Sequence, residues 1–240
     1  MRNARGIFIG LAIILLWTAG LFALLSIDLA TIPLYGAIPA MLAQTFLYTG
    51  LFITAHDAMH GLVAPKRNRL NNFIGTLCVI LYALFSYKRL RAEHREHHAH
   101  PGSGDDPDFH DGAHAGFAAW YVHFMKTYVT WQQIAGMAIA FNLMAHVLKI
   151  PQPNLLLFWA APALLSTLQL FYFGTYLPHR KPPGGYDNPH RAASNDFSVF
   201  WSFITCYHFG YHWEHHEFPH VPWWRLPRIR RDAMKEKVFT

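Results

Sequence analysis

Uncharged hydrophobic runs separated by basic segments form the main pattern along the chain. Residues 7–27 and 33–55 carry no charged side chain, and each is longer than the roughly 20 residues that cross a bilayer as a helix. A third run, 155–177, is also long enough, and neighbouring helices can satisfy the backbone groups that its Pro162 frees. Residues 127–148 form a weaker fourth run, which polar side chains interrupt, and a position partly on the membrane surface is the alternative for it. The pattern predicts an all-α integral membrane protein with about four transmembrane helices.

The hydrophobic segment at 70–87 differs from these runs because basic side chains flank it on both sides. Its central apolar part, 73–85, is short for a complete crossing. Excess Lys and Arg mark the cytoplasmic side of a membrane protein. The flanking basic residues are Lys66, Arg67, Arg69, Lys88, Arg89 and Arg91. We therefore expect a re-entrant or interfacial segment that dips into the membrane from the cytoplasmic side, with the N-terminus also in the cytoplasm.

The composition supports a membrane location and adds one anomaly, an excess of histidine. Hydrophobic residues make up 52% of the 240-residue chain and charged residues 14%, against about 25% charged in soluble domains. The chain has 17 His but only two Cys and no CxxC pattern, which does not support a thiolate metal site. No linker or repeat divides it, so we expect one domain, 1–240. The basic run 225–237 is expected to contact anionic lipid, and no nucleic-acid partner is expected.

Three histidine motifs lie close to the predicted membrane surface. The first, HDAMH, begins at the end of the second span, and the other two, HREHH and HWEHH, share one spacing about half a chain apart. Histidines three or four residues apart lie on one face of a helix, so each motif can direct its imidazoles at one point, and an adjacent pair can serve two metals. The predicted topology places all three motifs in a cytosolic, histidine-rich helical cap. The ligands predicted from these motifs are His56, His60, His94, His97, His98, His212, His215 and His216.

This supply of imidazoles is twice the four ligands that close a structural zinc site, so the motifs predict two metal ions. Imidazole ligands without thiolate suit Fe, Zn, Cu or Ni. Iron is favoured if the substrate is a hydrocarbon buried in lipid, because unactivated C–H bonds need activated oxygen and offer a Lewis acid no carbonyl group. Metal-bound histidines usually donate their second nitrogen to a carboxylate or carbonyl. The carboxylates placed for this role are Asp57, Glu96, Asp106 and Glu214, with a solvated charge or an ordinary loop residue as the alternative for each.

Taken together, the three motifs resemble those of the membrane histidine-motif oxygenases and desaturases. A closer resemblance, to bacterial β-carotene ketolases, covers nearly the whole chain and is carried by the strings TAHDAMHG, HREHHAHPGSGDDPDFH, FGTYLPHR and CYHFGYHWEHHEFPHVPWWRLP. Members of the wider superfamily bring a further histidine from the end of a later span, and His179 in TYLPH matches that position. The resemblance thus implies His179 as a ninth ligand. His208, four residues before His212, is the competing candidate and is otherwise expected to support the ligands by hydrogen bonding.

The resemblance implies a non-haem enzyme with two iron ions that uses O2 and electrons from a separate protein of the ferredoxin type. Its expected reaction is oxidation of carbon 4 of β-ionone rings by two hydroxylations, followed by dehydration of the gem-diol. β-Carotene would become echinenone and then canthaxanthin, and zeaxanthin would lead toward astaxanthin. The expected location is the bacterial inner membrane, with the metal site on the cytoplasmic side and with carotenoid and lipid as partners.

A polyene without a polar group is held only by shape and apolar contact, so aromatic side chains near the motifs are candidates for the substrate tunnel. These candidates, for each of which lipid or core packing is the alternative, are Phe109, Trp120, Phe173, Tyr176, Phe203 and Tyr211. The histidines alone do not separate a ketolase from a carotenoid 3-hydroxylase or a fatty-acyl desaturase or hydroxylase of the same superfamily. A membrane metal transporter is disfavoured, because its ionisable ligands would lie within the spans, whereas these histidines gather at one interface.

Overall fold

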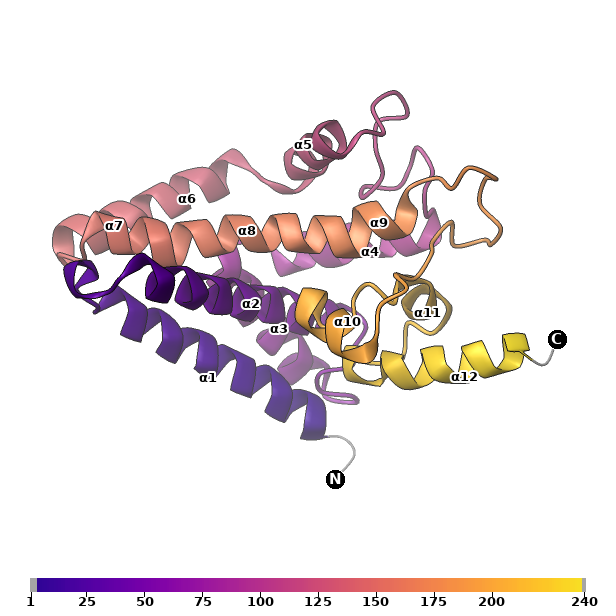
Figure 1. Cartoon of the computed structure of the whole chain (residues 1–240), viewed down its shortest axis with the longest axis horizontal. Helices are drawn as coiled ribbons and strands as arrows, with labels where there is room; N and C mark the ends of the chain where they lie inside the picture. Colours follow the sequence, from indigo (N-terminus) through magenta and orange to yellow (C-terminus); the bar gives the residue numbers. More distant parts are fainter. Residues whose placement is uncertain (1–3, 239–240) are drawn as a thin grey trace.

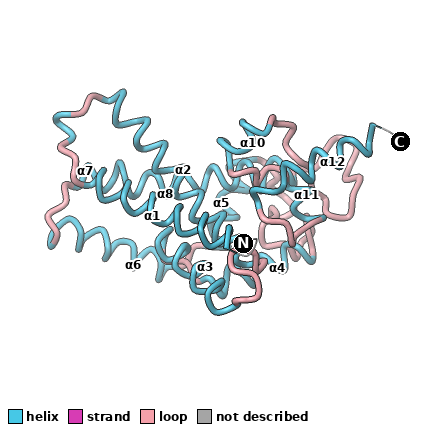
Figure 2. Tube along the Cα trace, turned by 90° about the horizontal axis from the view of Figure 1, so that it is seen from below, coloured by secondary structure: helices cyan, strands magenta, loops and turns pink. Residues whose placement is uncertain are grey.

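The computed structural model describes residues 4–238, and within that range it consists of helices and loops without a strand (Figures 1 and 2). The all-α prediction is therefore confirmed for the described part of the chain. The α-helices are α1 (Arg5–Leu25), α2 (Leu34–Met59), α3 (Asn68–Ala83), α4 (Tyr87–Ala99), α5 (Phe117–Tyr128), α6 (Trp131–Asn142), α7 (Gln152–Leu155), α8 (Ala161–Leu170), α9 (Leu177–His179), α10 (Val199–Cys206), α11 (His212–Glu217) and α12 (Leu226–Val238). Shorter turns are the π-helical η3 (Leu143–Val147), η4 (Leu156–Ala160) and η5 (Phe171–Tyr176) and the 3-10 helices η2 (Leu29–Thr31) and η6 (Trp223–Arg225).

Three helices in the described part are long and apolar enough to cross a membrane. They are Arg5–Leu25, Tyr35–Met59 and Gln152–His179, the last running without a break through α7, η4, α8, η5 and α9. Each coincides with one of the three strong hydrophobic runs in the sequence. The runs predicted these helices because a transmembrane helix needs only local apolarity over its own length.

Residues 127–148 do not form one unbroken helix: α5 ends at Tyr128, and the next helix runs from Trp131 through η3 to Val147. It is shorter than the three candidate spans, so a fourth span in this region stays a prediction. A capping box at Thr130 begins this helix. The Thr130 hydroxyl accepts from the backbone N–H of Gln133, and the Gln133 side-chain oxygen accepts from the backbone N–H of Thr130. A capping box fixes a helix start because it satisfies otherwise unpaired N–H groups. Gln133, read from the sequence as an interruption of a span, is part of this start signal.

Helices α3 and α4 contain the segment predicted to dip into the membrane, and they are bent by 100° relative to each other. The bend lies at Leu84, whose φ of 57° is in the left-handed region, and Ser86 then caps α4 by accepting from Arg89 N. Counted as one broken span, this pair would raise the number of candidate spans to four. The bend fits a segment that enters and leaves on one face, and its depth in the membrane stays a prediction.

Helix α2 forms the centre of the bundle and packs against α1, α3 and α8. Its Tyr48 is fully buried and meets Trp17 of α1 and Tyr82 of α3 edge to face. The Thr49 hydroxyl lies 2.9 Å from Ser166 Oγ of α8, which ties the two long helices together in the apolar interior. These contacts fix the direction of α2, and with it the position of the histidines at its C-terminal end.

One end of the elongated molecule consists of turns between long helices, and the other end holds several short helices and the ends of the long ones (Figure 1). Figure 1 shows the turn between α1 and α2 beside the turn between α6 and α7 at one end, while α4, α9, α11 and α12 gather at the other. Figure 2 shows the same separation from below. The elements that carry the histidine motifs therefore come together at one end of the bundle, as the predicted topology required.

Candidate metal centre

The structure brings the nine histidines predicted as ligands to one place. They come from the end of α2, from α4, from the end of the long α7–α9 helix and from α11. In each motif the i, i+3 and i+4 spacing turns the rings to one side of its helix. The nine histidine rings, which come from positions between 56 and 216 of the chain, face one another across the space between these four elements.

One group of four nitrogens joins α2, α4 and α11. The nitrogens of His56, His60, His94 and His215 all lie within 4.8 Å of one another. Nε2 of His60 is 2.7 Å from Nε2 of His94, and the ring of His56 lies 4.5 Å from those of His94 and His215. A sphere of imidazole nitrogens of this size matches the ligand shell of a single transition-metal ion.

A second group of four lies beside the first. It consists of His97, His179, His212 and His216, again within 4.8 Å of one another and all buried. Nε2 of His216 is 3.1 Å from Nε2 of His97 and 3.0 Å from Nε2 of His212. The adjacent His215 and His216 thus belong to different groups, which is the division that the paired histidines suggested.

His98 lies between the two groups. Its Nε2 is 3.0 Å from Nε2 of His215, and its ring stacks on that of His216 at 4.3 Å between centroids. An imidazole in this position is within reach of either group.

The donor set fits bound metal ions. Both ring nitrogens of His56 and Nε2 of His179 are buried without a hydrogen-bond partner in the described residues, and an unpartnered buried polar atom costs about 1–3 kcal/mol. Burial, followed by the neighbouring His212, lowers the pKa of His216 well below the usual range. Burial likewise lowers the pKa of His212 and His215. These rings are therefore neutral near pH 7, which is the form that binds a metal.

Two ligand candidates have their second nitrogen fixed by hydrogen bonds. Nδ1 of His97 donates to Asp106 Oδ1 at 2.9 Å, and this carboxylate also accepts from the amides of Gly102 and Asp108. Nδ1 of His179 donates to the carbonyl of Arg191 at 3.0 Å. Each bond sets the tautomer that leaves Nε2 free for a metal.

The other predicted supporting residues lie in different surroundings. Asp57 is buried, 3.8 Å from Nδ1 of His56, and accepts from Trp223 N. Glu214 is buried against Ser194 and Arg230, with a 3.0 Å bond to the guanidinium, so it holds α11 to α12. Glu96 is exposed, with its carboxylate 3.5 Å from Nδ1 of His100, which matches the solvated-charge alternative.

His208, the competing ninth ligand, does not join either group. Its Nδ1 lies 3.2 Å from Ser202 Oγ, and its ring stacks on Tyr211. The reason lies in the backbone, because Tyr207 and His208 both have positive φ and separate α10 from α11. His208 therefore does not share a helical face with His212, contrary to the four-residue spacing.

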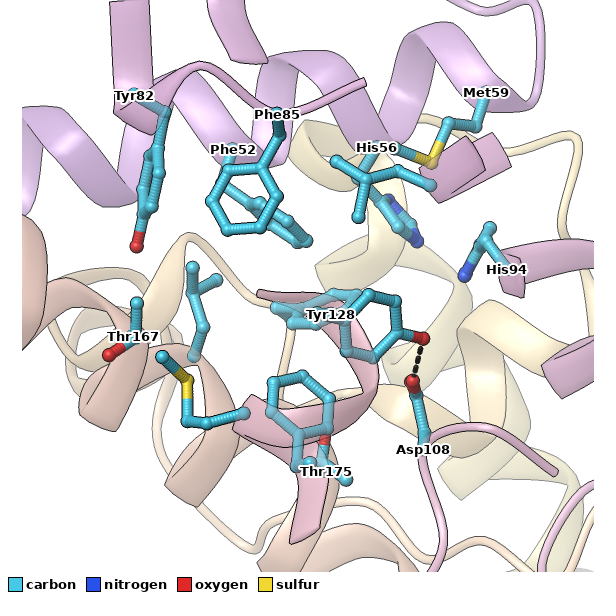
Figure 3. A pocket seen from close by; sticks show the side chains of 15 residues that line it. Phe52, His56, Met59, Tyr82, Phe85, His94, Asp108, Tyr128, Thr167 and Thr175 are labelled. Carbon is cyan, nitrogen blue, oxygen red and sulfur yellow. Dashed lines mark hydrogen bonds between the residues drawn. The ribbon is translucent and has the colours of Figure 1, made fainter. Parts of the chain in front are cut away.

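An apolar cavity ends at the first histidine group (Figure 3). His56 and His94 close one end, while the Tyr128 ring lies in the middle with its hydroxyl turned to Asp108. The lining residues are Phe52, His56, Met59, Tyr82, Phe85, Leu90, His94, Asp108, Phe124, Met125, Tyr128, Thr167, Leu170, Thr175 and Phe209. A second, almost wholly apolar groove between α3, α6 and α8 shares four of these residues: Tyr82, Phe85, Met125 and Thr167. The two therefore adjoin along these four residues.

None of the six aromatic residues predicted from the sequence to line a substrate tunnel lines either cavity. Trp120 is buried with Nε1 bonded to the Asp108 carbonyl, and Phe109 and Tyr176 pack on it. Phe173 packs on Phe197, Phe203 on Phe46, and Tyr211 lies under Arg230. Proximity to the motifs in sequence did not reveal which face of each helix meets the cavity.

The fold and the paired histidine groups define a class: helical proteins with candidate membrane spans and a clustered, buried histidine site at one end. The chain belongs to the fatty acid desaturase family, whose model matches residues 30–139 and 125–238. It is similar to a β-carotene ketolase of Haematococcus lacustris, with 43% identity over 95% of this chain and 80% of that relative. A β-carotene ketolase of Paracoccus sp. (strain PC1) is 44% identical over 92% of this chain and 90% of its own length. A zeaxanthin 4-ketolase of Chlamydomonas reinhardtii is 47% identical over 78% of this chain and 43% of its own length. These relatives confirm the resemblance identified in the sequence.

Proposed function

We propose that this protein is a carotenoid 4-ketolase, which oxidises carbon 4 of β-ionone rings with O2 at a histidine-bound di-iron centre. The names of its relatives support the substrate class and the position of oxidation. The observation that carries the proposal is an apolar cavity that ends against His56 and His94 of the first histidine group. A hydrocarbon ring in that cavity would place its carbon atoms beside the metal site.

The histidines would hold two iron ions. One ion would be bound by His56, His60, His94 and His215, and the other by His97, His179, His212 and His216. His98, which lies between the two groups, would be able to bind either ion. Bound iron would supply the activation of O2 that an unactivated C–H bond requires. The protein's part is to present neutral imidazoles, fix their orientation through Asp106 and the Arg191 carbonyl, and exclude water.

The overall reaction balances as two hydroxylations at one carbon. Each one converts C–H to C–O–H with one O2, two electrons and two protons, and releases one water. The second gives a gem-diol, which loses water to leave the ketone. Each hydroxylation places one oxygen atom of O2 in the product, and reduction of the other atom to water consumes the two electrons. These electrons would come from a separate donor protein of the ferredoxin type.

Shape and apolar contact would hold the ring, because a polyene hydrocarbon offers no hydrogen-bonding group. Phe52, Phe85 and Phe209 supply aromatic walls in the inner cavity. The outer groove along α6 and α8 would hold the conjugated chain against apolar residues such as Met137 and Leu164. Lipid-dissolved substrate would thus reach the site from within the membrane.

The proposed location is the bacterial inner membrane with the histidine end on the cytoplasmic side. The basic flanks of α3 and α4 support this orientation through the excess of Lys and Arg that marks cytoplasmic segments. Basic residues of α12 lie at the same end of the molecule, where they would contact anionic lipid (Figure 1).

Expression of the chain in a bacterium that makes β-carotene, followed by pigment analysis, tests the proposal. We expect echinenone and canthaxanthin. Zeaxanthin would identify a 3-hydroxylase instead, and unchanged pigment with altered fatty acids would identify a desaturase. Variants His97→Ala and His215→Ala should lose the ketone and part of the bound iron, so full ketone formation by either would overturn its role as an essential ligand.

A further inference from the structure

A hydrogen-bonded polar pair, Tyr128 and Asp108, lies in the lining of the inner cavity, which also includes Thr167 and Thr175. The Tyr128 hydroxyl donates to Asp108 Oδ1, and both residues line the cavity (Figure 3). Because the tyrosine proton is directed at the carboxylate, the phenolic oxygen still has lone pairs with which to accept a hydrogen bond.

The pair is held in place from several sides. The Asp108 amide donates to Asp106 Oδ1 at 2.8 Å, and the Asp108 carbonyl accepts from Trp120 Nε1 at 2.8 Å. Tyr128 packs on Phe124 within the same helix. These contacts fix the Asp108 segment, and with it the carboxylate that accepts the Tyr128 hydroxyl.

The cavity's other tyrosine and its Thr167 have partners outside the cavity and lie toward the end away from His94 (Figure 3). The Tyr82 hydroxyl donates to Ser166 Oγ at 3.0 Å, and Thr167 Oγ1 donates to the Leu164 carbonyl. The Tyr128–Asp108 pair, in contrast, lies nearer the end of the cavity that His56 and His94 close (Figure 3). A pure hydrocarbon ring at that end could make no hydrogen bond with the pair.

We propose that the Tyr128–Asp108 pair holds the hydroxyl group of the half-oxidised ring, so that the 4-hydroxy intermediate stays at the site until it is oxidised again. This inference rests on the proposed ketolase function. The carbinol O–H donates to the Tyr128 oxygen, whereas the hydrocarbon ring makes no such bond. Tyr128 is thereby a residue that decides between alcohol and ketone as the product.

The variant Tyr128→Phe removes the hydroxyl and keeps the ring. Because a single hydrogen bond contributes about 0.5–1.5 kcal/mol, the ratio of 4-hydroxy to 4-keto pigment in β-carotene-producing cells, compared at equal total conversion, should rise by about twofold to tenfold. A purely structural role would slow both oxidations alike and leave the ratio unchanged at equal total conversion. An unchanged ratio, with ketone still formed, overturns the inference.

Tyr121→Phe is the matched control. Tyr121 lies on the same helix and its hydroxyl is 2.6 Å from Thr167 Oγ1, but it lines neither cavity. It loses the same group from the same helix, so its pigment ratio should equal that of the wild type. A ratio raised as much as in Tyr128→Phe would contradict a specific role for Tyr128.

A measurement on the unmodified protein decides the question if Tyr128→Phe does not accumulate. Purified wild-type enzyme, supplied with O2 and an electron donor, should reach half-saturation with 4-hydroxy-β-carotene at a concentration about fivefold lower than with β-carotene. Equal or weaker saturation by the alcohol overturns the inference. A wild-type protein that forms no 4-oxygenated pigment at all would instead overturn the proposed function itself.

Discussion

Nδ1 of His97 lies 2.9 Å from Asp106 Oδ1, in a bond whose two side chains are each 1% exposed. The same carboxylate accepts from Gly102 N through its other oxygen, at 2.7 Å. Since a carboxylate only accepts, the bond fixes the proton of His97 on Nδ1 and leaves Nε2 facing the second histidine group. The loop after HREHH therefore sets the orientation of a ligand candidate within that motif.

Replacement of this carboxylate should weaken metal binding without removing a ligand. In Asp106→Asn the side chain keeps its size but has one acceptor oxygen, which cannot serve both His97 and Gly102. We expect iron affinity to fall by about tenfold to 100-fold, the usual effect of losing such a supporting group. Iron retained per protein chain, measured after dialysis against increasing chelator, provides the test.

Asp105→Asn is the control for this variant. Asp105 is exposed and bonds Ser103 Oγ through its backbone N–H, which the substitution preserves. Its iron retention should match that of the wild type. Equal retention by Asp106→Asn and Asp105→Asn would show that the buried carboxylate does not support the metal.

The two candidates for a ninth ligand give opposite predictions. Among the described residues, Nε2 of His179 lies within the second group and has no hydrogen-bond partner, whereas His208 lies beside Ser202 and Tyr211 outside that group. His179→Ala should therefore reduce bound iron from about two ions to about one per chain, and His208→Ala should leave it unchanged. Elemental analysis of the purified variants distinguishes them, and iron loss in His208→Ala alone would reverse the assignment.

The candidate spans and the spacing of the histidines were readable from the sequence because both depend on local order. A run such as 7–27 is apolar along its own length, and the i, i+3, i+4 spacing of a motif fixes one helical face. The break before Trp131 was missed because Thr130 and Gln133 look like polar interruptions until they are seen to cap a helix. His179 was identified by resemblance, since a lone histidine has no spacing to interpret.

The cavity proposed to bind the substrate could not be predicted in the same way. Its walls come from α2, α3, α4, α5, α8, η5 and the loops that carry Phe85, Asp108 and Phe209, so the inward faces depend on how remote helices cross. Phe85 and Tyr128 lie in stretches with many other aromatic residues, and nothing local marks them. Phe203, near a motif in sequence, instead packs against Phe46 and Trp223.

The residues shared by the inner cavity and the outer groove define a passage that a larger side chain should close. Met125 lines both, so Met125→Trp should block access of the ring and reduce ketone formation by about tenfold or more while iron binding remains. Val122→Trp, on the exposed side of the same helix, is the control and should retain activity. Pigment and iron analyses of both variants test the path. Normal ketone formation by Met125→Trp would show that substrate arrives by another way.

Gly174 permits the close approach of Phe209, and a methyl group there should disturb the site. A Cβ at Gly174 would overlap the Phe209 ring, which lines the inner cavity and lies 4.8 Å from the ring of His56. Gly174→Ala should cost about 1–3 kcal/mol of stability through overpacking, and ketone formation should fall because the displaced ring moves into the cavity or against His56. Thermal denaturation in detergent and pigment analysis measure the two effects.

A second substitution separates this steric cause from a general loss of helix stability. In the double variant Gly174→Ala with Phe209→Leu, the smaller side chain removes the overlap, so the combined loss of stability should be less than the sum of the two single losses. Gly184→Ala is the control, because a Cβ at Gly184 meets open space, and its stability and activity should match the wild type. Strict additivity in the double variant would mean that Gly174 matters for a reason other than contact with Phe209. Recovered stability without recovered ketone formation would assign Phe209 itself a part in holding the ring, since its aromatic wall would be the one element still missing.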